Sequence, residues 1–241
     1  MALRVAAGLV SRFTAQLSVL HAEAIEAPPY FTPQQIAVIE RERRAARAQA
    51  TRFVRQFAER NSALPGVVQI VESAPAEAIV QEAAKAHLVV MGTHGRHGPR
   101  LWWMGSVAER VSHESPTPVL VVRADAEVSP QEMFNRPLVV ADGSGAAADA
   151  VGVANGLADA FGGAVREPIA RCETDLASQR SATSIVVARA GDRDGGFDGA
   201  AVERWLRRCT LPMLFVPSAG GALSSMHLKA RGTSGISSHW P

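Results

Sequence analysis

Hydrophobic and polar positions along this chain follow two different periods, and each change of period marks the start of a new element. Short runs of branched aliphatic residues are typical of buried strands, whereas apolar residues that recur every three or four positions indicate amphipathic helices. In the first half this pattern predicts helices at 2–14, 33–60, 75–86 and 105–113, which alternate with strands at 16–22, 67–72, 88–92 and 118–123.

Strands and helices that alternate in this way predict an α/β protein, with parallel strands and helical crossovers on both faces of the sheet. The longest predicted helix carries the charged run RERRAARAQATRFVRQFAER, which we interpret as a solvated face. Its apolar residues define the opposite side. We expect the buried side of this helix to include Val38, Ala45, Ala48 and Phe57.

The second half of the chain repeats the first in a degenerate form. Residues 105–122, GSVAERVSHESPTPVLVV, align without gaps with residues 199–216, GAAVERWLRRCTLPMLFV. The early segment AAGLVSRF aligns in the same way with ANGLADAF, at 154–161. Two copies of one α/β unit are the simplest interpretation. The expected organisation is a first unit at 1–123, a linker at 124–136, a shortened second unit at 137–217 and a disordered tail at 218–241.

A glycine-rich segment joins the strand at 88–92 to the helix that follows it. Its glycines and a serine form the pattern Gly-x2-Gly-x9-Gly-Ser, from Gly92 to Ser106. A helix start reached through such a loop offers free N–H groups and a positive dipole end to a phosphate, and glycine lets the backbone approach it closely. The spacing fits neither a P-loop nor a G-x-G-x-x-G loop. The alternative is a plain strand–loop–helix whose glycines only make turns.

This motif, followed by VAERV and a PVLVV strand, resembles the universal stress protein family. In the nucleotide-binding members it holds the ribose and phosphates of ATP, so the resemblance implies an ATP site, with Mg²⁺ as a further candidate. It also implies two side-by-side doubly wound parallel-sheet units with strand order 3-2-1-4-5. The residues that would bind the nucleotide are Gly92, Thr93, His94, Gly95, Arg96, Gly105, Ser106 and Val107.

Alignment of the two copies shows that the first lacks a counterpart of one segment. In the second copy, thirteen residues at 136–148, RPLVVADGSGAAA, precede the first helix, whereas Met1 already lies inside the matching helix of the first copy. In the family this segment is the central first strand. Its loss would leave ladder groups unpaired on both neighbouring strands. We therefore expect a true start upstream of Met1, or another segment or subunit in the gap.

The second copy has the opposite defect. It keeps Asp142 and Ser144 after its first strand, which match the family's first-strand motif. Arg189 and Asp192, however, stand at the positions of the first two loop glycines, and a carboxylate there repels phosphate. We predict that the second copy is a structural partner that binds no nucleotide, so Asp142 and Ser144 have no ligand.

Composition excludes several classes of function. The formal net charge is +2 with no basic stripe, so no nucleic-acid partner is predicted, and no apolar run is long enough to span a membrane. Cys172 and Cys209 form no C-x-x-C pair, which favours reduced packing residues in a cytoplasmic protein. Residues 1–22 are basic, but their apolar run is too broken for a targeting segment, so a helix and a strand are expected there.

The remaining candidates favour binding over turnover. His94 and His97 lack a third ligand, so no metal site is predicted, and Ser106 lacks a base and suits a helix cap. A nucleotide-free scaffold and a slow ATPase remain open as alternatives. The final strands of the two copies would pair along their edges, either in a homodimer or as an intramolecular pseudo-dimer, through Val119–Arg123 and Leu214–Pro217.

Overall fold

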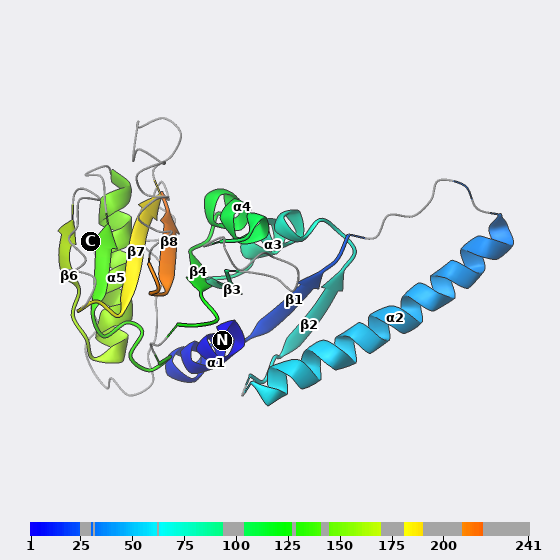
Figure 1. The fold of residues 1–241 in the computed structure, drawn as a ribbon, viewed down its shortest axis with the longest axis horizontal. Helices are drawn as coiled ribbons and strands as arrows, with labels where there is room; N and C mark the ends of the chain where they lie inside the picture. Colours follow the sequence, from blue (N-terminus) through cyan, green and yellow to red (C-terminus); the bar gives the residue numbers. More distant parts are fainter. Residues whose placement is uncertain are drawn as a thin grey trace.

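A computed structural model of the chain describes residues 1–24, 30, 32–61, 63–93, 104–126, 129–140, 145–169, 181–189 and 209–218. Helices alternate with mostly parallel strands, which confirms the predicted α/β class (Figure 1). The elements are α1 (Ala2–Phe13), β1 (Ser18–Ala22), α2 (Pro33–Arg60), β2 (Val67–Val71), α3 (Pro75–Ala83), β3 (Val89–Gly92), α4 (Ser106–Glu114), β4 (Val119–Val122), β5 (Pro137–Val140), α5 (Gly145–Phe161), β6 (Arg166–Ile169), β7 (Ser184–Arg189) and β8 (Met213–Pro217).

The described strands form two sheets. One has six strands in the order β3-β4-β8-β7-β5-β6, and the other consists of β1 and β2. All pairs are parallel except β4 with β8, which run antiparallel with Val119 opposite Phe215 and Val121 opposite Met213. Strands from the two halves thus join in one sheet instead of two separate units. The first half is itself divided, because no described strand lies between β1 and β3.

The strands at the centre of the six-stranded sheet are buried on both faces. On β4, Leu120 packs into a cluster with residues of α1 and α5, whereas Val119 and Val121 pack on the opposite face beneath α3 and α4. This alternation follows from the two-residue repeat of a strand. It places the largest cluster of buried side chains at the junction of the two halves, where Leu120 and Leu214 are both fully buried.

The segment that connects the halves contributes to this core. Met133 and Phe134 have no exposed surface, and the Phe134 ring lies 5.6 Å from the ring of Phe161 on α5. A Cβ at Gly163 would collide with the backbone carbonyl of Asn135, so glycine is required at that close approach. Residues 129–136 therefore pack as part of the core that both halves share.

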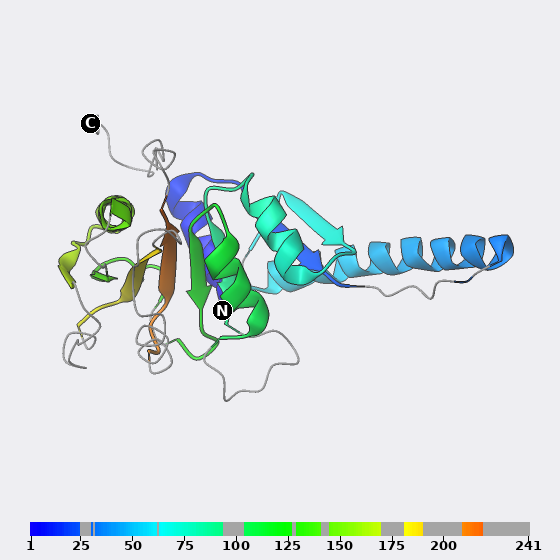
Figure 2. The ribbon, with the colours of Figure 1, turned by 90° about the horizontal axis from the view of Figure 1, so that it is seen from above.

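The long helix α2 departs furthest from the predicted packing. A capping box formed by Thr32 and Gln35 starts it, and Figure 2 shows it extending away from the sheets. The predicted buried side was wrong: Val38 and Phe57 are 54% and 51% exposed. A two-stranded sheet offers a helix only a narrow contact. The residues of α2 that are partly or fully buried are Ile39, Arg43, Ala50, Thr51, Val54 and Ala58, whereas Ala45 and Ala48 are exposed.

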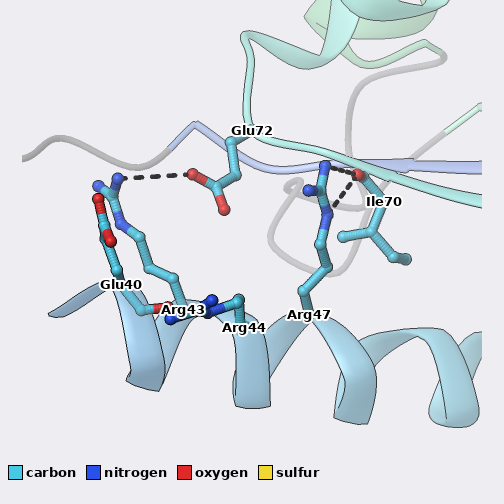
Figure 3. Close-up of polar contacts among 6 residues, drawn as sticks. All are labelled: Glu40, Arg43, Arg44, Arg47, Ile70 and Glu72. Carbon is cyan, nitrogen blue, oxygen red and sulfur yellow. Dashed lines mark hydrogen bonds and ion pairs between the residues drawn. The ribbon is translucent and has the colours of Figure 1, made fainter. Parts of the chain in front are cut away.

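Arginine side chains hold α2 against β2 (Figure 3). The guanidinium of Arg47 donates to the carbonyl of Ile70 through Nη2 at 2.7 Å and Nε at 3.2 Å. Arg43 lies 3.8 Å from the carboxylate of Glu72. Residues on either side of Ile70 pair with β1, so its own carbonyl faces the outer edge of β2. Arg47 therefore covers a backbone acceptor on this exposed edge.

Candidate functional site

The candidate site begins where β3 ends. Gly92 is the last residue of β3 and pairs with Val122 of β4. Thr93 follows it, is only 4% exposed, and donates its N–H to the carbonyl of Val122 at 3.2 Å. The carboxyl ends of parallel strands are where α/β proteins bind ligands. The backbone of Gly92 and Thr93 is thus held in place at such an end.

A backbone hydrogen bond joins the two ends of the glycine loop. The N–H of Gly105 donates to the carbonyl of Thr93 at 2.6 Å, which keeps the end of β3 against the start of α4. His94, Gly95 and Arg96 lie outside the described residues, so their predicted roles stay predictions. The described part of the site is therefore the two ends of the loop.

The first turn of α4 supplies the backbone donors of the site. Gly105 is the N-cap, with extended backbone angles (φ −77°, ψ 156°), and no described side chain caps the helix. Ser106 is the first helical residue, not the cap that the sequence suggested, and its side chain is exposed. Val107 packs against the cluster beneath α4. The first-turn N–H groups and the positive dipole end thus lack a capping carboxylate or hydroxyl.

Charged side chains of α4 add no free cation to this turn. Glu109 lies in the first turn and is exposed, so its carboxylate opposes an anion at the helix start. Arg110 donates from Nε to Glu114 at 2.8 Å, and this hydrogen bond raises the pKa of Arg110. Any phosphate bound by the described residues would therefore be held by backbone donors and a hydroxyl.

Packing fixes α4 against the sheet. Met104, Ala108 and Val111 are buried and contact the face of β4 that carries Val119 and Val121. These contacts set the height of the helix above the sheet. The first turn of α4 is therefore positioned by buried aliphatic contacts on its lower side.

Arg189, the last residue of β7, holds the opposite end of α4. Its Nη1 and Nη2 donate to the carbonyls of Ser112 and Ser115, each at 2.7 Å. Burial lowers the pKa of Arg189, but a guanidinium stays charged in proteins and suits the negative end of a helix dipole. The sequence analysis treated this residue only as a replacement for a loop glycine. The signal for its role was a single arginine at the end of the aliphatic strand SIVVAR.

The corresponding site of the second half lies outside the described residues. The structure describes the end of β5 at Val140 and the start of α5 at Gly145, but not Asp142 or Ser144 between them. The prediction that these two residues bind no nucleotide stays a prediction.

Other sequence candidates were examined in the described part of the chain. Within it, no group of three or more His, Cys, Asp or Glu side chains is placed to hold a metal ion. No described helix is long and apolar enough to cross a membrane. Cys209 is a free, buried thiol, and burial raises its pKa, whereas Cys172 lies outside the described residues.

Sequence comparisons connect the first half of the chain with one family. The model of the universal stress protein family matches residues 1–123. A universal stress protein of Mycobacterium bovis is 42% identical over 65 residues, which are 27% of this chain and 22% of that protein. One from Methanocaldococcus jannaschii is 47% identical over 57 residues, 23% of this chain and 34% of the relative. The matches thus span only about a fifth to a third of these relatives.

Solved structures resemble both halves. A universal stress protein from Archaeoglobus fulgidus has a TM-score of 0.60 at 18% identity and covers 90% of this chain and 92% of its own. A putative universal stress protein from Pseudomonas aeruginosa has a TM-score of 0.54 at 13% identity, with 89% and 87% covered. At these identities the likeness concerns the fold alone, and it extends well beyond residue 123.

Proposed function

Because the chain belongs to the universal stress protein family, we propose that it binds an adenine nucleotide, ATP, where β3 meets α4. The observation that carries this proposal is the hydrogen bond between Gly105 and Thr93, which holds the strand end beside an uncapped helix start. Within the described residues, the binding groups are those of Gly92, Thr93, Gly105, Ser106 and Val107.

The chemistry of these residues suits a phosphate group. The first-turn N–H groups of α4 donate to phosphate oxygens, and the helix dipole favours the negative charge. The exposed hydroxyl of Ser106 supplies a further donor. Glycine at 92 and 105 leaves room for the ligand beside the backbone. His94, Gly95 and Arg96 would add contacts from the loop, and Mg²⁺ would enter with the phosphates of ATP.

We propose further that residues 137–217 form a degenerate second unit that binds no nucleotide. The internal repeat supports this, as does the parallel order β6-β5-β7-β8 in the second half. Arg189 also supports it, since its guanidinium is used on the carbonyls of α4. The protein would then be a tandem member of its family that acts in the cytoplasm during a stress response.

Substituting Gly105→Asp tests the site. Aspartate is a good N-cap, so α4 should remain folded, but its carboxylate would take the first-turn N–H groups and repel phosphate. We expect calorimetric titration to show ATP affinity weakened at least about tenfold, since a charge at a helix end and a lost donor each contribute about 1 kcal/mol. The matched control is Gly152→Asp, which adds the same charge at an exposed position of α5.

Two results would contradict the proposal. Equal ATP affinity in the Gly105→Asp and Gly152→Asp variants would remove the nucleotide from the start of α4. If the unsubstituted chain bound no ATP, the nucleotide-free scaffold would take the place of the proposed function.

A further inference from the structure

Two strand edges in the first half have no strand partner among the described residues. β3 is the terminal strand of the six-stranded sheet, and β1 pairs only with β2. Helices nevertheless cover both faces around them. Val5 and Leu9 of α1 lie in the cluster that includes Val90, whereas α3 packs against β1 and, through Ile79, into the cluster that includes Met91. The helix layers thus continue where the sheet is interrupted (Figure 1).

The backbone of β3 has free groups on the side away from β4. The N–H groups of Val89 and Thr93 donate to carbonyls of the β4 segment, at 2.9 and 3.2 Å. In a parallel pair, alternate residues direct both backbone groups toward the same neighbour. Val90 and Gly92 therefore direct their N–H and C=O groups toward the opposite edge, where no described strand is paired.

The backbone of β1 has the same arrangement. The carbonyl of Leu17 accepts from the β2 segment, and the N–H of Glu23 donates to it at 3.0 Å, so odd-numbered residues face β2. Leu20 and Ala22 then direct their backbone groups toward the other edge. The outer edge of β2 differs, because Arg47 occupies one of its carbonyls. The edges of β1 and β3 have no such cover among the described side chains.

Burial of the aliphatic side chains supports an incomplete layer. Residues 119–122 of β4 are at most 1% exposed, as expected for a parallel-sheet strand with helices on both faces. The residues of β3, including Val90 and Met91, are only partly buried, and so are Leu20 and its neighbours in β1. Apolar surface thus remains beside both open edges.

The second half shows what fits such a position. There β5 lies between β6 and β7 and pairs with both in parallel. The internal repeat aligns α5 with α1 and β7 with β3, and β6 follows α5 as β1 follows α1. The equivalent of β5 would therefore lie between β1 and β3. β5 itself is a fully buried aliphatic strand, PLVV.

We propose that β1 and β3 together bind one extended aliphatic segment of another polypeptide, which adds between them as a strand. Such a segment would satisfy the backbone groups at both edges and place its side chains beneath α1 and α3. No other class of ligand presents alternating donors and acceptors along two sides at this spacing. The site needs no nucleotide, so it is independent of the proposed function.

The first test adds the hexapeptide RPLVVA, copied from residues 136–141, to the full chain without nucleotide and follows amide hydrogen exchange by NMR. We expect the amides of Leu20, Val90 and Gly92 to exchange at least about tenfold more slowly, because pairing protects them. The amides of Val89 and Thr93 serve as internal controls, since both already donate to the β4 segment. Unchanged exchange at millimolar peptide would overturn the proposal.

Proline substitutions separate strand addition from non-specific apolar binding. The peptide RPLPVA lacks one N–H and should give no protection. In the protein, Val90→Pro and Leu20→Pro each remove an N–H from an open edge and leave the β4 and β2 ladders intact. Each variant should lose peptide binding at an unchanged unfolding midpoint. Equal binding of both peptides, or protection that grows with protein concentration alone, would contradict a heterologous strand.

Discussion

Replacing Phe134 with alanine should lower the free energy of unfolding by about 3–5 kcal/mol, the range typical of a buried aromatic residue that leaves a cavity. Phe134 has no exposed surface and lies in one cluster with Leu120 of β4, Leu214 of β8 and Leu157 of α5. The cavity would therefore open where elements of both halves meet. Urea denaturation followed by circular dichroism measures the change.

The neighbouring residue Gln131 provides the control, because its side chain is exposed in the same connecting segment. Gln131→Ala should change stability by no more than about 0.5 kcal/mol, as is usual for surface substitutions. If Phe134→Ala cost as little as Gln131→Ala, the segment between the halves would be a loose tether and not part of the core.

The order and kind of most elements could be predicted from the sequence because their signals are local. The strand expected at 118–123 is observed at Val119–Val122, and the helix expected at 105–113 is observed at Ser106–Glu114. A period of two or of 3.6 residues is set by backbone geometry, and the apolar residues report it directly. β6 was missed because its sequence, REPI, contains two charged residues and a proline, which suit an edge strand but resemble a loop.

Packing partners were harder to predict, because a pattern does not say what covers an apolar face. The expected side of α2, with Val38 and Phe57, is exposed, since the helix lies beside a narrow two-stranded sheet. The segment with Met133 and Phe134 lacks a clear period, although both side chains are buried. In each case the burial depends on elements that are distant in the sequence.

The candidate site was predictable in part. A glycine followed by serine after a buried strand correctly placed the start of α4, because helix starts have local signals. The hydrogen bond from Gly105 to Thr93 was not foreseen, since it depends on how the loop returns to the strand. The contact of Arg189 with α4 was also missed, because 74 residues separate Arg189 from Ser115.

Arg189→Ala should lower the free energy of unfolding by about 2–3 kcal/mol, because charge-assisted hydrogen bonds contribute more than neutral ones and their removal leaves carbonyls without a donor. The guanidinium bonds two carbonyls at the end of α4, on Ser112 and Ser115. Its loss would also remove a cation from the negative end of that helix. Chemical denaturation of the full chain measures the effect.

Two further variants identify the cause. Arg110→Ala removes an arginine from the same helix, but this side chain is exposed and pairs only with Glu114 among the described residues, so the cost should stay below about 0.5 kcal/mol. Arg189→Lys keeps the charge and loses the two-pronged geometry, so its cost should lie between the other two. Should Arg189→Lys match Arg189→Ala, geometry would dominate over charge. Should Arg189→Ala cost no more than Arg110→Ala, β7 would not hold α4 through this residue, and the first unit would owe nothing to the second at that end of the helix.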